Sequence, residues 1–442
     1  MTKLATIEYK KRRQTLLQQL PQGAVVVVQC APVHIRNGDV EHDYRQDSGF
    51  YYLSGMVEPQ TTLVLTNSVD GPMSTIFCRS KDKLQEIWHG RRLGLDKAPD
   101  ELLIEQAYPS ESLTEKLIEL LDGASQVVYG FGREDTAALL QQSLSALRSL
   151  KRQGKAWPTQ LVDLDPLVDA MRLLKSAAEI DQMALACNIS VAAHKRAMSS
   201  CKVGMNEYQL AAEVHHQFAM QGSPRVAYGS IVAGGENACI LHYTNNDQVL
   251  QDGDLVLIDA GCELDHYASD ITRTFPVNGR FSESQKIIYE IVLAAHQAAL
   301  ACIKPGAVFT DMQDAAAKVI TQGLIDIGFL TGELDTNITD QTYRKFYMHN
   351  IGHWLGMDVH DVGIYKLDGE SRPLIPGMVT TVEPGIYIDP DDTDIALQWR
   401  GIGIRIEDDI LVTESGYLNL TAHLPVAVAD IEALMAGEWL PI

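Results

Sequence analysis

The apolar positions of the first third of the chain predict short strands separated by helices. β-branched runs begin at four places, AVVVVQ at residue 24, TTLVLT at 61, STIFC at 74 and VVYGFG at 127. Runs of this length and composition between turn residues are typical of buried strands. A helical pattern is clearest over 134–149. Strands interleaved with helices predict a small α/β domain over residues 1–172.

A boundary near residue 172 follows from the next change of pattern. The segment KAWPTQLVDLDP is polar and is interrupted twice by proline, and it leads into MRLLKSAAEIDQM. There Ser176 and Glu179 have the spacing of a capping box before a long apolar helical pattern. We therefore predict a second domain over 173–442.

The second domain contains a weak internal repeat. The segment CKVGMNEYQLAAEVHHQFAMQG (201–222) resembles CIKPGAVFTDMQDAAAKVITQG (302–323). Each copy follows a long helical pattern that opens on a cap signature, at Ser176 and at Ser282, and a strand-rich segment follows each copy. The repeat predicts two halves related by a pseudo-twofold, with a site at the seam. Chance similarity between amphipathic helices is the alternative.

Charge and composition exclude several classes of partner and location. The 442 residues contain 36 Lys and Arg against 58 Asp and Glu, a net charge of −22, which disfavours nucleic acid and anionic membrane surfaces as partners. No apolar run approaches the roughly 18 residues of a membrane span, and the first residues lack the apolar core of a secretory signal. Seven scattered cysteines without a CxxC pair favour reduced thiols in a cytoplasmic protein.

Two aspartates stand on adjacent predicted strands. In DLVLIDAG, apolar residues flank Asp259 on both strand faces, so its carboxylate is expected to be buried. A buried carboxylate requires an ion partner or a metal. If 255–261 and 268–275 form an antiparallel hairpin, Asp259 and Asp270 can lie opposite one another on one face, about 5 Å apart. The alternative is a pair of surface acids on an exposed hairpin.

Histidines gather in MHNIGHWLGMDVHDVG (348–363), where His349, His353 and His360 alternate with glycines. Imidazole is a frequent metal ligand and a proton carrier near neutral pH. The glycines favour a loop folded closely around a ligand over a helix. The spacing predicts a site, although a single such histidine is more often structural, and it does not say which histidine is the ligand.

Two further carboxylates and an arginine follow. In TTVEPGIYI, Glu383 comes at a strand end before Pro384 and Gly385, which also suits an exposed turn. In GIGIRIEDDILVT (401–413), a single strand is expected, with Arg405 and Glu407 on the face opposite the isoleucines. An ion pair on a solvated sheet is the alternative for these two.

These positions together supply four carboxylates and one or more imidazoles from both halves of one domain. Such hard, oxygen-rich donors favour Mn, Co or Mg, and four carboxylates balance two divalent ions. The donor set predicts a dinuclear centre with metals about 3.5–4 Å apart.

The motifs LIDAG, SDITRTFPV, HxxGHxxGxxxHD, VEPGIYI and GIGIRIEDD closely resemble those of the pita-bread metallopeptidases, and among these the bacterial Xaa-Pro aminopeptidase (aminopeptidase P) family. YRQDSGFYYLSG (44–55) and EIWHGRRLG (86–94) resemble the family's creatinase-like N-terminal domain. The resemblance covers nearly the whole chain. It implies an α/β (α+β) architecture, a small α/β domain followed by a pseudo-twofold pita-bread catalytic domain.

The resemblance also implies roles for individual residues. Two metals per subunit, usually manganese, would be bound by Asp259, Asp270, His353, Glu383 and Glu407, with Asp270 and Glu407 bridging. Catalytic roles would fall to His242, His360, Glu383 and Arg405, and substrate contacts to His349, Trp88 and Tyr387. Members are commonly homotetramers, in which Trp88 would reach a neighbouring subunit's site.

The expected reaction is removal of the first residue from peptides with proline second. Two cations would make a bridging hydroxide available near neutral pH and polarise the scissile carbonyl. Glu383 would accept a proton, His360 would donate to the oxyanion, and His242 would lie on the proton path to the departing nitrogen.

Three alternatives remain open at this stage. A prolidase restricted to Xaa-Pro dipeptides would use the same five ligands. Creatinase shares the fold without the metals, and the intact ligand set argues against it. A non-catalytic pita-bread protein that binds partners would be expected to have lost ligands.

Overall fold

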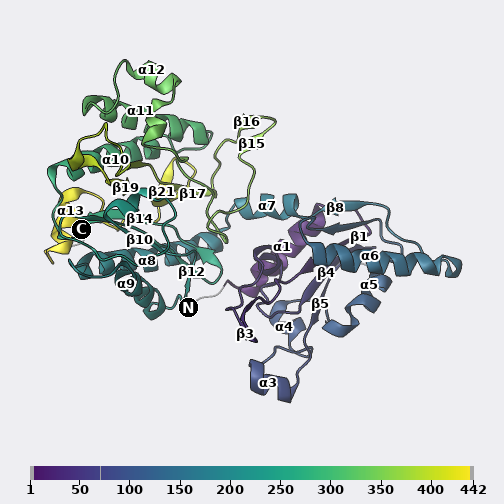
Figure 1. The fold of residues 1–442 in the computed structure, drawn as a ribbon. Helices are drawn as coiled ribbons and strands as arrows, with labels where there is room; N and C mark the ends of the chain where they lie inside the picture. The colour runs from purple at the N-terminus through teal and green to yellow at the C-terminus, as the bar shows by residue number, and fades with distance from the viewer. Residues whose placement is uncertain (1–3, 70, 439–442) are drawn as a thin grey trace. The chain divides into compact units, whose positions relative to one another are not determined.

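The computed structural model describes residues 4–69 and 71–438, and these fall into two compact units (Figure 1). The division lies between Arg172 and Leu173. Within the described ranges, no helix combines the length and apolar character needed to cross a membrane.

The first unit is built on a six-stranded mixed sheet with the order β6-β5-β4-β1-β7-β8. β4 runs antiparallel to both β1 and β5, and the other neighbouring pairs are parallel. The four predicted strands are all present in it. The strand bounds are β1 Ala24–Gln29, β4 Thr62–Ser68, β5 Gly71–Cys78, β6 Gln106–Pro109, β7 Gln126–Tyr129 and β8 Leu161–Asp163.

Both faces of this sheet are covered, which explains the unbroken valine run of β1. Val25 and Val27 pack with Leu140 of α6 (Glu134–Ser149), and α5 (Leu113–Leu121) lies on the same side. Side chains alternate along a strand, so the intervening valines face the opposite side, where α1 (Thr6–Gln18) and α2 (Ser48–Ser54) contact the sheet. α6 occupies the range predicted for it.

Shorter elements complete this unit. They are the hairpin of β2 (Ile35–Asn37) and β3 (Val40–Glu41), α3 (Lys83–His89), α4 (Ala98–Leu102) and α7 (Asp165–Leu173).

The second unit contains two pairs of long helices, and each pair opens on a predicted cap. α8 (Ala177–Ser200) pairs with α9 (Glu207–Met220), and α10 (Glu283–Ala301) pairs with α11 (Phe309–Asp326). At Ser176 and at Ser282 both hydrogen bonds of a capping box are formed. The caps therefore fix where the two first helices begin, because they satisfy backbone N–H groups that the helix leaves unpaired.

Strands follow each helix pair, so the order helix pair then strands occurs twice, as the repeat predicts. The first set is β9 Arg225–Val226, β10 Ile231–Gly234, β11 Leu255–Asp259, β12 Cys262–Leu264, β13 Tyr267–Ala268 and β14 Thr272–Pro276. α12 (Leu334–Thr339) precedes the second set. That set is β15 Lys366–Leu367, β16 Glu370–Ser371, β17 Val379–Val382, β18 Gly385–Tyr387, β19 Gly403–Arg405, β20 Asp408–Val412 and β21 Tyr417–Asn419, before α13 Val428–Met435.

Small sheets in the second unit place the predicted ligands near one another. The sheet orders are β10-β11-β14, β13-β12-β9, β17-β20-β21 and β18-β19. The two strand sets meet where Glu407 forms a bridge with Thr272, and the Glu407 N–H donates to the Thr272 carbonyl at 3.1 Å. This contact joins the first half of the unit to the second directly at the ligand positions.

The single strand predicted over 401–413 is wrong, because the chain breaks at this meeting point. β19 ends at Arg405 and β20 begins at Asp408, and Glu407 between them turns to pair with Thr272. Every residue from 402 to 412 is buried, so the alternative of an ion pair on a solvated sheet is wrong as well.

Candidate metal centre

Asp259 and Asp270 converge, although not through the predicted register. β11 and β14 are antiparallel and pair Asp259 with Thr272, so Asp270 lies two residues beyond the position directly opposite. The chain between them folds into the β12 and β13 hairpin. Gly261 permits this fold, because a Cβ there would overlap the Ser269 carbonyl. Both carboxyl groups are buried, which excludes the alternative of surface acids on an exposed hairpin.

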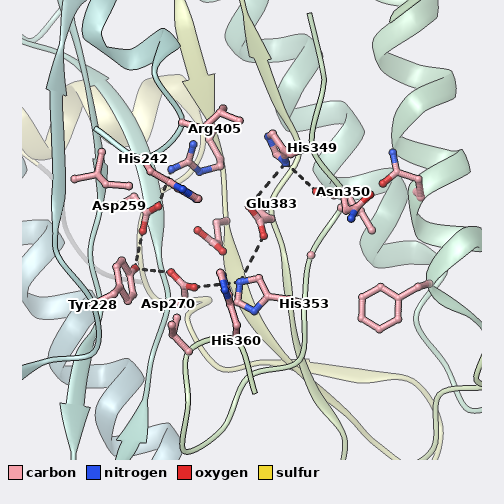
Figure 2. Close-up of a pocket in the computed structure, with 18 of the residues that line it drawn as sticks. Tyr228, His242, Asp259, Asp270, His349, Asn350, His353, His360, Glu383 and Arg405 are labelled. Atoms are coloured by element: carbon pink, nitrogen blue, oxygen red, sulfur yellow. Dashed lines mark hydrogen bonds and ion pairs between the residues drawn. The ribbon is translucent and has the colours of Figure 1, made fainter. Parts of the chain in front are cut away.

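The hydroxyl of Tyr228 joins the two carboxyl groups. It lies 2.6 Å from Asp259 Oδ1 and 2.5 Å from Asp270 Oδ1 (Figure 2). The hydroxyl has one proton to donate, so the second contact requires a proton on a carboxyl group or a cation in its place. Two acids held this closely around one hydroxyl are suited to share a cation.

The histidine loop runs beside β17, and this pairing positions His353. Residues 348–363 form no helix, as predicted. The His353 carbonyl accepts from the Thr381 N–H at 2.9 Å, and the Glu383 N–H donates to the Ile351 carbonyl at 2.8 Å. A Cβ at Gly352 would overlap the Thr381 carbonyl, so this close approach requires glycine.

Asp270, His353 and Glu407 form the tightest group. Each offers one ligand atom, and these atoms lie within 4.8 Å of one another. His353 Nδ1 is 3.0 Å from the Trp354 carbonyl, to which only a protonated nitrogen can donate. In the neutral ring, Nε2 is therefore the nitrogen with a lone pair free to bind a metal. Nε2 faces Asp270 Oδ2 at 3.4 Å and Glu383 Oε1 at 3.6 Å.

Burial and mutual repulsion raise the pKa of the carboxyl groups. Burial is the main cause for Asp259, Glu383 and Glu407, and neighbouring carboxylates add to it. Burial lowers the pKa of His353, but its contacts with Asp270 and Glu383 outweigh burial and raise the pKa to about 9. Divalent cations bound among these groups would relieve the repulsion. The donor set therefore fits a centre for hard divalent metals.

Arg405 is the buried cation that braces Asp259. Its Nη2 donates to Asp259 Oδ2 at 2.7 Å, and its Nη1 donates to the Tyr387 hydroxyl at 3.0 Å. That hydroxyl accepts from Arg405, so its own proton is directed to His349 Nε2 at 2.8 Å. Burial, followed by the charge of Arg405, lowers the pKa of His349 to about 4, which keeps the ring neutral.

Replacing Tyr387 with phenylalanine is expected to remove the hydrogen bonds that link Arg405 to His349, without loss of bound metal. Arg405 Nη1 and His349 Nε2 would each lose a buried partner, so kcat/KM should fall about tenfold with bound metal unchanged. Tyr417→Phe, at an exposed tyrosine of β21, is the matched control. Loss of metal, or an unchanged kcat/KM in Tyr387→Phe, would contradict this role.

A cavity of about 860 Å³ lies over the ligands. His242, His349 and His360 line it together with all five predicted ligands and Arg405. His242 and His360 are exposed, and the His360 ring lies 4.3 Å from the His353 ring, centroid to centroid. The backbone beside His360 is held by a buried ion pair, in which Lys175 Nζ donates to Asp361 Oδ2 at 3.0 Å.

Two predicted substrate contacts lie outside the lining of this cavity. Tyr387 is buried and reaches the site through Arg405 and His349. Trp88 belongs to α3 in the first unit, where its side chain is 76% exposed. A contact of Trp88 with another subunit stays a prediction.

Sequence reasoning missed Tyr228, Thr272 and Lys175. The Thr272 hydroxyl donates to Glu407 Oε2 at 2.6 Å and accepts from Arg405 Nε at 3.1 Å. Tyr228 follows a two-residue strand, and no charge or spacing marks it. Lys175 lies directly before Ser176, the N-cap of α8. A lysine at the start of a buried helix was the one sequence signal that pointed to it.

The chain belongs to metallopeptidase family M24, whose model matches residues 181–414. The model for the N-terminal domain of aminopeptidase P matches residues 9–129. These matches confirm the predicted resemblance and the predicted fold class, a small α/β domain followed by an M24 catalytic domain. The chain is therefore a hydrolase of the metallopeptidase class.

Individual relatives are similar to this chain along its full length. The Xaa-Pro aminopeptidase of Escherichia coli is 45% identical over 99% of both chains. The solved structure of aminopeptidase PepP from Pseudomonas aeruginosa is 48% identical, covers 99% of both chains and superposes with a TM-score of 0.98. A zinc-substituted E. coli aminopeptidase P in complex with product is 44% identical, with a TM-score of 0.97, and covers 99% of this chain and all of that one.

Proposed function

We propose that this M24 peptidase removes the N-terminal residue from peptides with proline in second position. The observation that carries the proposal is the group of Asp270, His353 and Glu407, in which both acids are buried and the histidine is half-buried. It lies in the wall of a cavity with Asp259 and Glu383 beside it. The full-length similarity to Xaa-Pro aminopeptidases supports the choice of substrate.

The five ligands would hold two divalent cations, with Asp270 and Glu407 shared between them. We propose manganese, since the donors are four carboxylates and one imidazole without a thiolate. When bound, the cations would supply an activated water and polarise the scissile carbonyl.

The chain's own residues supply the proton transfers. Glu383 accepts a proton from the attacking water, because its carboxyl group faces the cavity beside His353. His360, exposed in the cavity wall, donates a hydrogen bond to the carbonyl oxygen as negative charge develops there. Proline nitrogen in a peptide bond carries no hydrogen, so the leaving nitrogen must receive its proton from the site, and His242 lies on the cavity wall for that transfer.

Other residues position the substrate or the site. We assign His349 to contact with the peptide, and Arg405 and Tyr387 to holding Asp259 and His349 in place. We further propose that the protein is cytoplasmic and forms a homotetramer in which Trp88 approaches a neighbouring subunit's cavity. The support is the exposed apolar face of α3, with Leu84 63%, Ile87 77% and Trp88 76% exposed.

A series of peptides tests the proposal against a prolidase. Arg-Pro, Arg-Pro-Pro and longer Arg-Pro-Pro peptides are incubated with the manganese-loaded enzyme, with an N-acetylated peptide as control. Release of free arginine from the longer peptides is expected, and the blocked peptide should survive. Hydrolysis confined to the dipeptide would make the protein a prolidase, and cleavage of the blocked peptide would exclude an aminopeptidase.

A further inference from the structure

Gln313 is a buried amide in the cavity wall that the proposed chemistry leaves unused. It lies on the second turn of α11, and the cavity lining includes it. Its Oε1 and Nε2 are both shielded from solvent, and neither has a hydrogen-bond partner among the described residues. Buried amide groups are almost always paired, so an unpaired one at a cavity calls for a partner that enters the cavity.

A neighbouring tyrosine does not satisfy this amide. The Tyr347 hydroxyl is also buried and lies beside Gln313; burial raises its pKa, and the contact with Gln313 offsets part of that rise. Even if Tyr347 donated to Oε1, that oxygen would keep a second lone pair and Nε2 would keep both its hydrogens.

The wall around Gln313 is apolar and aromatic. Phe309 lies four residues earlier on α11, on the same face of the helix, and its ring is 5.2 Å from the Tyr365 ring and 4.7 Å from the Trp354 ring, centroid to centroid. Phe309 and Tyr365 line the cavity with Gln313. A polar group of the ligand that enters this sector meets Gln313, and Thr310 of the same helix also lines the cavity.

An amide side chain matches one chemical group of the substrate. A carboxamide oxygen accepts from an N–H, and its NH2 donates to a C=O. The N–H and C=O of a trans peptide group point to opposite sides, so one carboxamide binds one of the two. The bond before proline has no N–H. The first peptide group after the scissile bond that can donate an N–H to Oε1 is therefore the one that follows proline.

We infer that Gln313 hydrogen-bonds the peptide group after proline, and so favours peptides of three or more residues over Xaa-Pro dipeptides. The inference rests on the proposed function, because it assigns a part of the same site. A dipeptide ends in a carboxylate, which only accepts, so Oε1 would face a negative charge with no hydrogen to receive. Gln313 is thus a specificity residue for the part of the peptide that follows proline.

The test compares kcat/KM for three substrates in the manganese-loaded full chain. Arg-Pro-Ala carries the complete peptide group, the ester analogue with lactate in place of alanine lacks its N–H, and Arg-Pro lacks the group. Gln313→Leu should lower kcat/KM for Arg-Pro-Ala about tenfold and for Arg-Pro less than threefold. Wild type should prefer the amide over the ester, and this preference should vanish in Gln313→Leu.

Gln322→Leu is the matched control, because Gln322 lies on the same helix, is exposed and donates a hydrogen bond to Asp326. Metal content and the unfolding midpoint of each variant separate a folding defect from a loss of specificity. Equal losses on all three substrates, or no loss on Arg-Pro-Ala, would overturn the inference. If wild type fails to cleave Arg-Pro-Ala at all, the proposed function fails instead, so the two failures are distinguishable.

Discussion

Asp270→Ala and Glu407→Ala are expected to lose bound metal and activity together. Each variant would remove a carboxylate proposed to contact both cations, and the remaining acids would face one another across a buried site. Activity should fall at least about 10³-fold, by analogy with the loss of a whole catalytic unit. Metal content per chain, measured on the purified protein by elemental analysis, should fall in parallel.

Asp391→Ala is the matched control, since Asp391 is an exposed acid of the same unit. Asp270→Asn keeps the shape of the side chain and removes its charge, which guards against a variant that fails to fold. Two metals per chain with near-normal turnover in either alanine variant would refute the ligand assignment. Adding a chelator to the wild type and then restoring the metal should abolish and recover activity.

His360→Ala and His353→Ala are expected to fail in different ways. His360 is exposed in the cavity, and the loss of a donor to the oxyanion typically lowers kcat by about 10²–10³-fold. Its metal content should stay at the wild-type level. His353 presents Nε2 to Asp270 and Glu383, so His353→Ala should lose metal as well as activity.

The pair of variants forms its own control, because the two rings contact one another edge to face and belong to one loop. Metal content and steady-state kinetics should be measured on the same preparations. If His360→Ala empties the site and His353→Ala keeps its metals, the two roles must be exchanged.

The sequence predicts the elements of the fold better than the contacts between them. The valine run of β1, the range of α6 and the caps at Ser176 and Ser282 are local signals, since each depends on neighbours within a few residues. The structure bears out all four. The order helix pair then strands also follows from local patterns that occur twice.

Register and chain breaks could not be predicted, because distant segments decide them. The pairing of Asp259 with Thr272 depends on the hairpin inserted between their strands. The break at Glu407 depends on Thr272, whose carbonyl and hydroxyl both bind it from a strand in the other half. Tyr228 meets both aspartates through tertiary contacts 31 and 42 residues away in sequence, so no pattern in its own segment reveals it.

The meeting of Thr272 and Glu407 also fixes an order of events during synthesis. Asp259, Asp270 and Tyr228 leave the ribosome with the first helix pair, long before His353, Glu383 and Glu407 are made. A nascent chain that has folded only this first half offers two of the five proposed ligands, both of them aspartates, which is a weak site for a divalent cation. Binding of the proposed metals would therefore belong to the final stage of folding, when the second set of strands packs against the first.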